Sequence, residues 1–229
     1  MTDSAIPPVA ASWRRIDAWL AAHAPASAAL LAPPAEPAAL AAAEAALGAP
    51  LPADLAASLR RHDGASATVD VLPDLRLLSA ARVVEEWELR VEAERELRAE
   101  DEDDLPPLPG GGPYWHERWV PVAEFQGDVR AIDARPGPRQ GRFGPVYHDA
   151  PATFDDRTSW PSLAHCLADL AAWLVDRPPV AGARHWDDPF VGPAGELVWG
   201  WPPSRVRGLD GPGGPAEHGY RVAPVGLPG

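Results

Sequence analysis

Few side chains of this sequence could support nucleophilic chemistry. Cys166 is the only cysteine of the chain, and it could be imagined as a thiol nucleophile paired with His165 or His148. Adjacent residues on a helix point about 100° apart, so Cys166 and His165 cannot pair with each other. A single cysteine also excludes an internal disulfide framework and a cysteine-based zinc cluster. We therefore expect Cys166 to be a small core residue.

Metal and phosphate sites are equally poorly supported. His116-Glu117 lacks the second histidine, four residues later, that a zinc-binding helix needs, and the 7 histidines show no ligand spacing. The acidic run Glu100–Asp104 lacks the alternating oxygen ligands and central glycine of a calcium loop. No Gly-x-Ser-x-Gly motif occurs, and the chain has no lysine for a phosphate-binding loop. The expectation is a protein without catalytic residues, metal or cofactor, and not an enzyme.

Charge and composition narrow the class of partner. The 229 residues carry a formal net charge of -13, which disfavours nucleic acid because phosphate binding depends on Lys and Arg. Such an acidic surface suits a protein partner with a basic surface, although it could also serve only to keep the protein soluble. No apolar run of about 18 residues occurs and Met1–Ala10 has no signal-peptide pattern, so we expect a cytoplasmic protein without a membrane partner.

Helical patterns recur along most of the chain. Apolar residues at helical spacing predict a helix from Trp13 to about Pro25, a second over Leu40–Leu47 that ends at Gly48, and a third that starts at Pro52 and buries Leu55 and Leu59. Ser79 would cap a long helix. Its predicted inner stripe is Val83, Val84, Trp87 and Val91, and its predicted solvated charges are Glu85, Glu86, Arg90, Glu94, Arg95 and Arg98. Trp160–Leu174 is the clearest amphipathic helix.

Two regions have the pattern of antiparallel strands. Thr68–Leu72 and Leu75–Leu78 predict a hairpin around Pro73-Asp74, and a meander is expected from Trp119–Ala123, Val129–Asp133 and Gly144–His148, with a Gly127-Asp128 turn. The predicted fold class is α+β: a mainly antiparallel sheet packed by N-terminal helices, a central long helix and a C-terminal helix.

One domain with extensions follows from this order of elements. We expect a flexible N-terminus over 1–12, a domain over 13–175 with an acidic Pro/Gly loop insertion at 100–113, and a Gly/Pro/Trp-rich C-terminal extension over 176–229. That extension would either wrap the domain through its tryptophans or be partly disordered.

Several local phrases of the sequence occur in an order that is typical of one family. The phrases contain Gly48, Leu51, Pro52 and Leu55, then Asp63 and Gly64, then Trp87, and finally Trp119, Pro121, Asp133 and Gly144. Together they resemble the SMI1/KNR4 family of the SUKH superfamily. These residue types stop helices, start helices and fill cores, so we interpret them as a structural motif.

The resemblance implies a binding function. Bacterial members of this family commonly act as immunity proteins of polymorphic toxin systems, whereas fungal relatives regulate cell-wall synthesis. All 20 basic side chains are arginines, which together with abundant Ala and Pro suggests GC-rich bacterial coding. We therefore expect an immunity protein that binds and occludes a cognate toxin domain, a form of toxin–antitoxin pairing. The alternative is a regulatory or scaffolding protein of this type without a toxin.

The partner surface is predicted where the acidic loop meets the sheet. Tyr114 and Trp115 are expected to be partly exposed there, and tryptophan is enriched at interface hot spots. The hypothesis combines this aromatic pair with the acidic residues Asp101, Glu102, Asp103, Asp104 and Asp128.

Overall fold

The chain folds into two compact units, each built from segments that are distant in the sequence. The structure is a computed structural model that describes residues 6–66, 71–73, 75–100, 113–148, 150, 152, 154–178, 186–201 and 213–227. Unit 1 comprises Met1–Pro33, Gly64–Leu77 and Ala164–Gly229. Unit 2 comprises Pro34–Asp63 and Leu78–Leu163.

Three helices belong to unit 2: α3 (Pro37–Leu47), α4 (Ala53–Leu59) and α5 (Ala80–Glu100). Helix α3 ends at Gly48, whose φ of 65° is the left-handed conformation that glycine adopts without steric cost. Pro52 directly precedes α4 as its N-cap residue. The predicted helix stop at Gly48 and helix start at Pro52 are therefore confirmed to within one residue.

Two side chains satisfy backbone donors at the start of α5. Ser79 Oγ accepts a hydrogen bond from Arg82 N at 3.2 Å, which is the cap that the sequence predicted. Asp63, from the end of the α4 segment, accepts a second one from Ala80 N at 2.7 Å. A carboxylate at a helix N-terminus also interacts favourably with the helix dipole. The family-motif residue Asp63 thus fixes the start of the longest helix.

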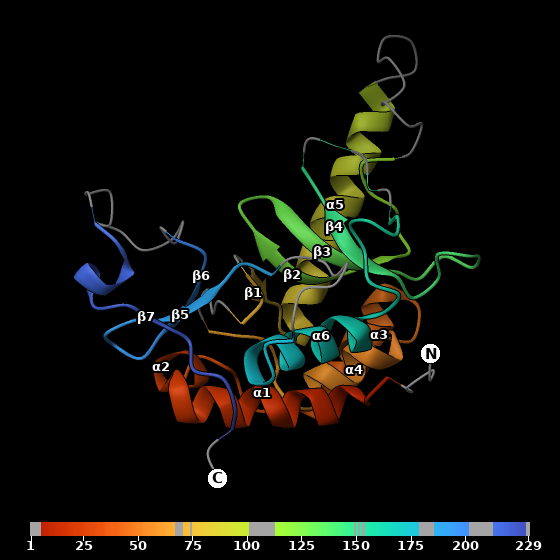
Figure 1. The fold of residues 1–229 in the computed structure, drawn as a ribbon. Helices are drawn as coiled ribbons and strands as arrows, with labels where there is room; N and C mark the ends of the chain where they lie inside the picture. Colours follow the sequence, from red (N-terminus) through yellow and green to blue (C-terminus); the bar gives the residue numbers. More distant parts are fainter. Residues whose placement is uncertain are drawn as a thin grey trace. The chain divides into compact units, whose positions relative to one another are not determined.

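An antiparallel meander forms the sheet of unit 2. Strands β2 (Trp119–Phe125), β3 (Asp128–Asp133) and β4 (Phe143–Val146) follow one another in space as in sequence (Figure 1). The β2–β3 turn consists of Gln126 and Gly127, both with positive φ (49° and 94°), as in the tight hairpin turns that match strand twist. The predicted Gly127-Asp128 turn is therefore displaced by one residue, because Asp128 already pairs with Phe125.

Strand β2 contains a proline and an irregularity at the same place. The pairing register with β3 shifts between Pro121 and Ala123. Proline has no N–H to give to a ladder and is tolerated inside sheets at edges and bulges. The family-motif residue Pro121 therefore coincides with the bulge of β2.

Helix α5 and the sheet of unit 2 enclose an aromatic core. Its buried members are Val91, Trp115, Trp119, Val129, Ala131, Val146 and Phe154, with Trp87 packed against them. Trp87 is half-buried, and its Nε1 donates to Glu117 O at 2.7 Å. The predicted inner stripe of α5 and the core role of Trp119 are confirmed.

Unit 1 contains α1 (Val9–His23), α2 (Pro25–Ala28), all of α6 (Leu163–Val175) except its first residue, and the short strand β1 (Arg76–Leu77). Helix α1 begins at Val9, so the predicted flexible stretch to residue 12 is too long. Helix α6 begins later than predicted, because the backbone of Trp160 forms a bridge with Phe143. Cys166 is fully buried in α6, as expected. Thr68–Asp70 and Asp74 of the predicted hairpin lie outside the described residues.

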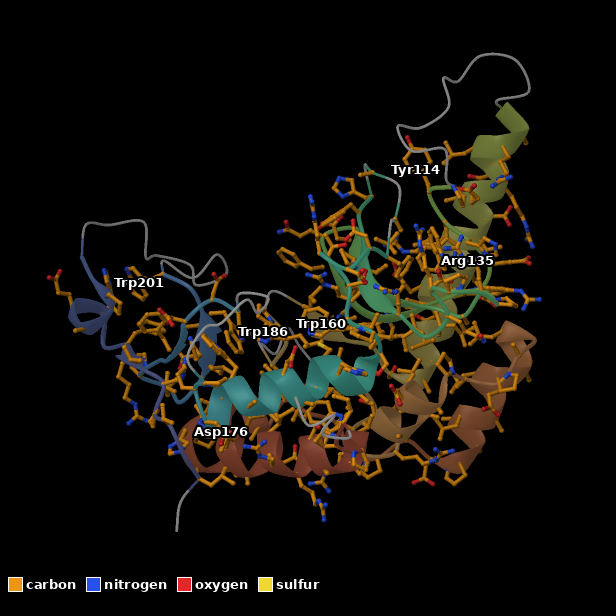
Figure 2. All side chains as sticks on the ribbon, turned by 45° about the vertical axis from the view of Figure 1, so that its right-hand side comes forward. Tyr114, Arg135, Trp160, Asp176, Trp186 and Trp201 are labelled. Atoms are coloured by element: carbon orange, nitrogen blue, oxygen red, sulfur yellow. The ribbon has the colours of Figure 1, made fainter. Side chains whose placement is uncertain are left out.

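The C-terminal extension contributes a second antiparallel sheet to unit 1. Strand β5 (Pro189–Val191) lies between β6 (Leu197–Trp199) and β7 (Arg221–Val222), and a 3-10 helix (Pro215–His218) precedes β7. Phe190, Val198 and Tyr220 form a small buried cluster with Trp201 beside it (Figure 2). In the described part of this segment, Trp186 contacts Trp199, and Trp201 contacts Phe190, His218 and Tyr220, so these tryptophans pack against residues of the extension itself.

Hydrogen bonds to backbone groups of the extension attach it to the helices of unit 1. Ser27 Oγ of α2 accepts from Leu197 N at 2.9 Å, and Gly195 O accepts from Ala26 N at 3.0 Å. Trp19 Nε1 of α1 donates to Pro224 O at 3.0 Å. These contacts use backbone groups of the extension, so they do not require a periodic side-chain pattern there.

The α+β fold expected from the sequence is confirmed by the described helices and antiparallel sheets, and the sheet of β5, β6 and β7 is an addition to the predicted elements. Among the helices that the structure describes, none has both the length and the apolarity needed to cross a bilayer.

Replacing Asp63 by alanine tests the cap of α5. Asp63→Ala removes the acceptor of the Ala80 amide and should lower the free energy of unfolding by about 1–2 kcal/mol. Asp63→Asn keeps an acceptor oxygen and should lose less. Urea unfolding followed by circular dichroism measures both, and equal losses for the two variants would contradict a hydrogen-bonding role.

Gly144→Ala tests a close contact in the sheet of unit 2. A Cβ at Gly144 would lie 2.9 Å from Ser159 Cβ and closer still to its Oγ. Overpacking of this kind costs about 1–3 kcal/mol. Gly144→Ala should therefore destabilise the protein, and Gly144→Ala/Ser159→Gly should recover much of the loss in thermal unfolding. Gly214→Ala is the control, because a Cβ there meets nothing within 4 Å.

Candidate partner-binding surface

Trp115 is a core residue and not an exposed anchor. Only 3% of it is exposed. The Trp115 ring meets the Trp119 ring edge-on, with 5.6 Å between the two centroids. The Arg90 guanidinium lies 5.2 Å from the centroid of the Trp115 ring. The prediction that Trp115 is partly exposed is therefore wrong, because the segment before β2 uses this side chain to close the aromatic core. Truncating Trp115 would report on packing rather than on binding.

The other predicted partner residues have different positions. Tyr114 is half-buried and lies at the edge of the described segment that leads into β2 (Figure 2). Asp128 is half-buried at the β2–β3 hairpin. The acidic residues Asp101, Glu102, Asp103 and Asp104 lie outside the described residues. Of the predicted surface, Tyr114 and Asp128 thus retain accessible area in the described part of the chain.

Part of the polar face of α5 is packed instead of solvated. Glu86 is buried, and its carboxylate accepts from Arg90 Nε at 2.8 Å. Arg90 also donates to Gly127 O at 2.6 Å, in the β2–β3 hairpin. The prediction of a solvated Glu86 and Arg90 is therefore wrong. A charged pair can be buried when both members find hydrogen-bond partners, and this one ties the helix to the hairpin.

The side chains of Asp128 and His148 lie in contact beside the same hairpin. Asp128 Oδ1 accepts from the His148 backbone N–H at 3.0 Å and lies 2.8 Å from His148 Nδ1. Partial desolvation alone would raise the pKa of Asp128, but the hydrogen bonds and charge of His148, with help from Arg90, lower the pKa of Asp128 below 3.8. Asp128 is therefore an ionised carboxylate, and its Oδ1 makes both contacts with His148.

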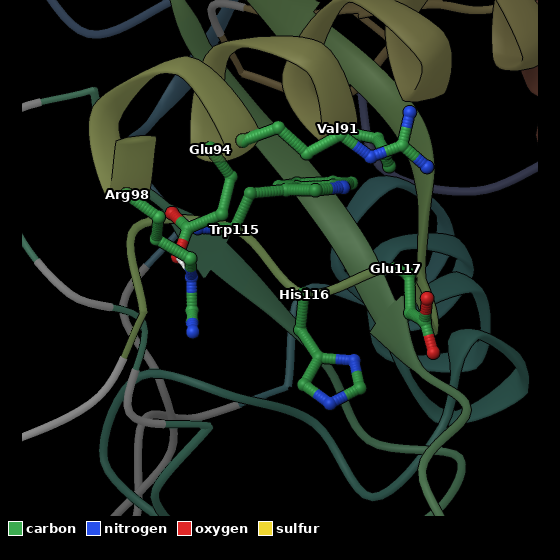
Figure 3. Close-up of a pocket in the computed structure, with 7 residues that line it drawn as sticks. Val91, Glu94, Arg98, Trp115, His116 and Glu117 are labelled. Carbon is green, nitrogen blue, oxygen red and sulfur yellow. Dashed lines mark hydrogen bonds and ion pairs between the residues drawn. The ribbon is translucent and has the colours of Figure 1, made fainter. Parts of the chain in front are cut away.

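A small hollow opens between α5 and the segment that leads into β2 (Figure 3). Its volume is about 260 Å³, and its lining consists of Val91, Glu94, Arg95, Arg98, Trp115, His116 and Glu117. Glu94 accepts from Arg98 Nε at 2.8 Å and from Trp115 N at 3.1 Å. The hollow is large enough for one polar side chain of a partner, and its charges are mixed.

His116 faces this hollow as a neutral ring. Partial burial, followed by the charge of Arg135, lowers the pKa of His116 below 6.5. In agreement, His116 Nδ1 accepts from the Arg118 backbone N–H at 3.0 Å, which a doubly protonated ring cannot do. At neutral pH His116 can therefore exchange hydrogen bonds with a partner without adding charge.

The buried carboxylate of Asp133 has a structural task. Arg135 donates to both of its oxygens, at 2.8 and 2.7 Å, and the Arg135 guanidinium lies 5.1 Å from the Trp119 ring centroid. Hydrogen bonding to Asp133 raises the pKa of Arg135, so this guanidinium stays charged. In the described part of the chain, no group of three His, Cys, Asp or Glu side chains is arranged to hold a metal ion.

The contacts of α5 with the β2–β3 hairpin and with the segment before β2 were not predicted from the sequence. Arg90 and Glu94 were assigned to solvent from helical periodicity alone. Both residues follow or precede an opposite charge by four positions, as Glu86–Arg90 and Glu94–Arg98, and this spacing is a local signal for side-chain pairs on a helix. Nothing in the sequence pattern distinguishes His116 from the other histidines.

Comparison with known proteins supports the family expectation. Residues 34–173 match the sequence model of the SMI1/KNR4 family (SUKH-1). The chain is also 32% identical over 192 residues to a Schizosaccharomyces pombe protein described as "Cell wall biosynthesis/cell cycle regulator smi1". The similarity covers 74% of this chain and 38% of the yeast protein, so the chain spans well under half the length of that relative.

Asp128→Asn tests the Asp128–His148 pair through pH. A carboxylate with a lowered pKa adds stability above its unfolded pKa near 3.8 and loses it as pH falls through the folded value. The pair is partly exposed, so its contribution should be at most about 1 kcal/mol. Unfolding measured at a series of pH values from 7 downward should show an advantage of wild type over Asp128→Asn that shrinks as the pH falls below 3.8. A difference that does not change with pH would contradict this electrostatic origin.

Proposed function

Because the chain belongs to the SMI1/KNR4 family (SUKH-1), as its match over residues 34–173 shows, we propose that it is a protein-binding module and not an enzyme. Its most specific role is that of an immunity protein, which neutralises a cognate bacterial toxin of a polymorphic toxin system by direct binding and occlusion. It acts in the cytoplasm, without a cofactor, and its partner is a toxin domain with a basic surface rather than nucleic acid or a membrane.

The observation that supports this proposal most strongly is that residues of the family motif stabilise the fold. Asp63 caps α5, Asp133 is held by Arg135, and Gly144 lies under Ser159. A residue whose polar atoms are already engaged in the fold is a poor candidate for chemistry on a substrate. The shared residues thus build a scaffold, and the surfaces around it can vary with the partner.

Charge supports a basic protein partner. A net charge of -13 over 229 residues attracts cationic surfaces and repels phosphate backbones. Electrostatic complementarity raises association rates and rejects wrong partners. Fast and selective capture is what a cell needs when it must block a toxin before damage occurs.

A second candidate function is a regulatory or scaffolding role without a toxin. The similarity to the fission yeast protein described as a cell wall biosynthesis and cell cycle regulator favours it. A regulator would bind resident proteins of the cell, and its loss would change growth in the absence of any toxin.

Co-expression distinguishes the two functions. The gene's neighbourhood is searched for a toxin-like reading frame, which is expressed in a sensitive host, alone and together with this chain, and colony formation is measured. An immunity protein restores growth by several orders of magnitude and co-purifies with the toxin. A catalytically inactive version of the toxin serves as the binding control. Absence of rescue at confirmed expression of both proteins would overturn the immunity proposal, and co-purification with housekeeping proteins would support the regulatory one.

A further inference from the structure

The outer side of α5 carries an apolar ridge that the fold does not use. Leu89 is 65% exposed and Leu97 is 37% exposed, and Ala93 between them is also exposed. The three residues are spaced by four, so they lie along one face of the helix over about 12 Å. The inner stripe that packs on the sheet is a different face, with Val83 and Val91 buried. A single exposed leucine is ordinary, whereas an aligned apolar strip on a surface helix marks an interaction site.

Four glutamates run beside this ridge. They are Glu85, Glu88, Glu92 and Glu96, all exposed and spaced by three or four residues. Arg82 pairs with Glu85 at 2.7 Å and Arg95 with Glu92 at 3.5 Å, and both pairs are open to solvent. No basic side chain among the described residues forms an ion pair with Glu88 or Glu96. The outer ridge of α5, defined as Leu89, Ala93 and Leu97 with these four glutamates, is therefore apolar along one side and acidic along the other.

We propose that the outer ridge of α5 docks a basic amphipathic helix of the protein partner. Such a helix laid along α5 would place its apolar side chains against Leu89 and Leu97 and its Lys or Arg side chains against the glutamates. The spacing by three and four residues repeats on both helices, so the contacts recur at each turn. The two arginine pairs on the ridge are exposed and cost little to rearrange.

The negative charge of the outer ridge of α5 favours a cationic helix over a second copy of the chain. Two copies of the ridge would bring eight glutamates together, and like charges across an interface are strongly unfavourable. A cationic helix gains the same apolar contact and neutralises Glu88 and Glu96. Figure 1 shows that the last turns of α5 project beyond the strands β2–β4 of unit 2.

The inference deepens the proposed function by naming the surface and the partner chemistry, and it rests on that function only in requiring a protein partner. The test therefore uses a defined probe and no toxin. The probe is a fluorescein-labelled 21-residue helical peptide with leucines on one face and lysines or arginines flanking them. A scrambled peptide of the same composition, which has no apolar face, is its control. Fluorescence anisotropy with the full chain measures binding.

Wild type should bind the amphipathic peptide, and more weakly as salt increases, but not the scrambled one. Leu89→Ser/Leu97→Ser should weaken binding by about tenfold or more. Glu88→Gln/Glu96→Gln should weaken it less and flatten its salt dependence. The matched control is Val222→Ser/Val225→Ser, which changes two residues that are 66% and 58% exposed in unit 1 and should leave binding unchanged. Thermal unfolding confirms that each variant keeps its fold.

Three results would overturn the proposal. These are no binding of the amphipathic peptide by wild type, full binding by Leu89→Ser/Leu97→Ser, and an equal loss in the Val222→Ser/Val225→Ser control. Sedimentation of the unlabelled chain adds a fourth, because self-association that Leu89→Ser/Leu97→Ser abolishes would assign the ridge to a second copy. Toxin rescue is measured separately, so failure of the immunity role and failure of the ridge are distinguishable.

Discussion

The arrangement of unit 2 depends on the contacts that the Arg90 guanidinium makes. It bonds to Glu86 on its own helix and to Gly127 O in the β2–β3 hairpin, and it lies over Trp115. A charge with a side chain only 14% exposed must be paired, so the helix, the hairpin and the segment before β2 are held in one relative position. Trp87 and Glu94 add hydrogen bonds from α5 to the same segment, at Glu117 O and Trp115 N. The outer ridge of α5 is presented on a helix fixed in this way.

Within unit 2, the residues that build the fold differ from the residues that are accessible at its surface. Residues of the family motif satisfy buried donors, start or stop helices and fill the aromatic core. Glu88 and Glu96 of α5 are exposed and stand apart from these structural contacts. In a binding protein, specificity comes from such positions, because rejecting the wrong partner depends on charges and shapes at the surface.

The sequence predicted the order of elements and the capping residues well, since Gly48, Pro52 and Ser79 act through local backbone rules. It predicted the environments of Trp115, Glu86 and Arg90 wrongly. Periodicity assigns a helix face to solvent unless something packs there, and the partners of Arg90 outside its own helix, Trp115 and Gly127, lie 25 and 37 residues away along the chain. Strands β5, β6 and β7 were not predicted, because strands of two or three residues between glycines and prolines have no readable alternation.

The bond from Trp19 to Pro224 joins residues 205 positions apart. Trp19 is fully buried in α1, yet the carbonyl that satisfies its indole is synthesised near the end of the described chain. On a ribosome, the segments of unit 2 emerge and can pair while α1 still lacks the segment around Pro224. Unit 1 must therefore complete its folding late, after long-range loop closure. Until then the indole N–H of Trp19 lacks the acceptor that it has in the folded chain.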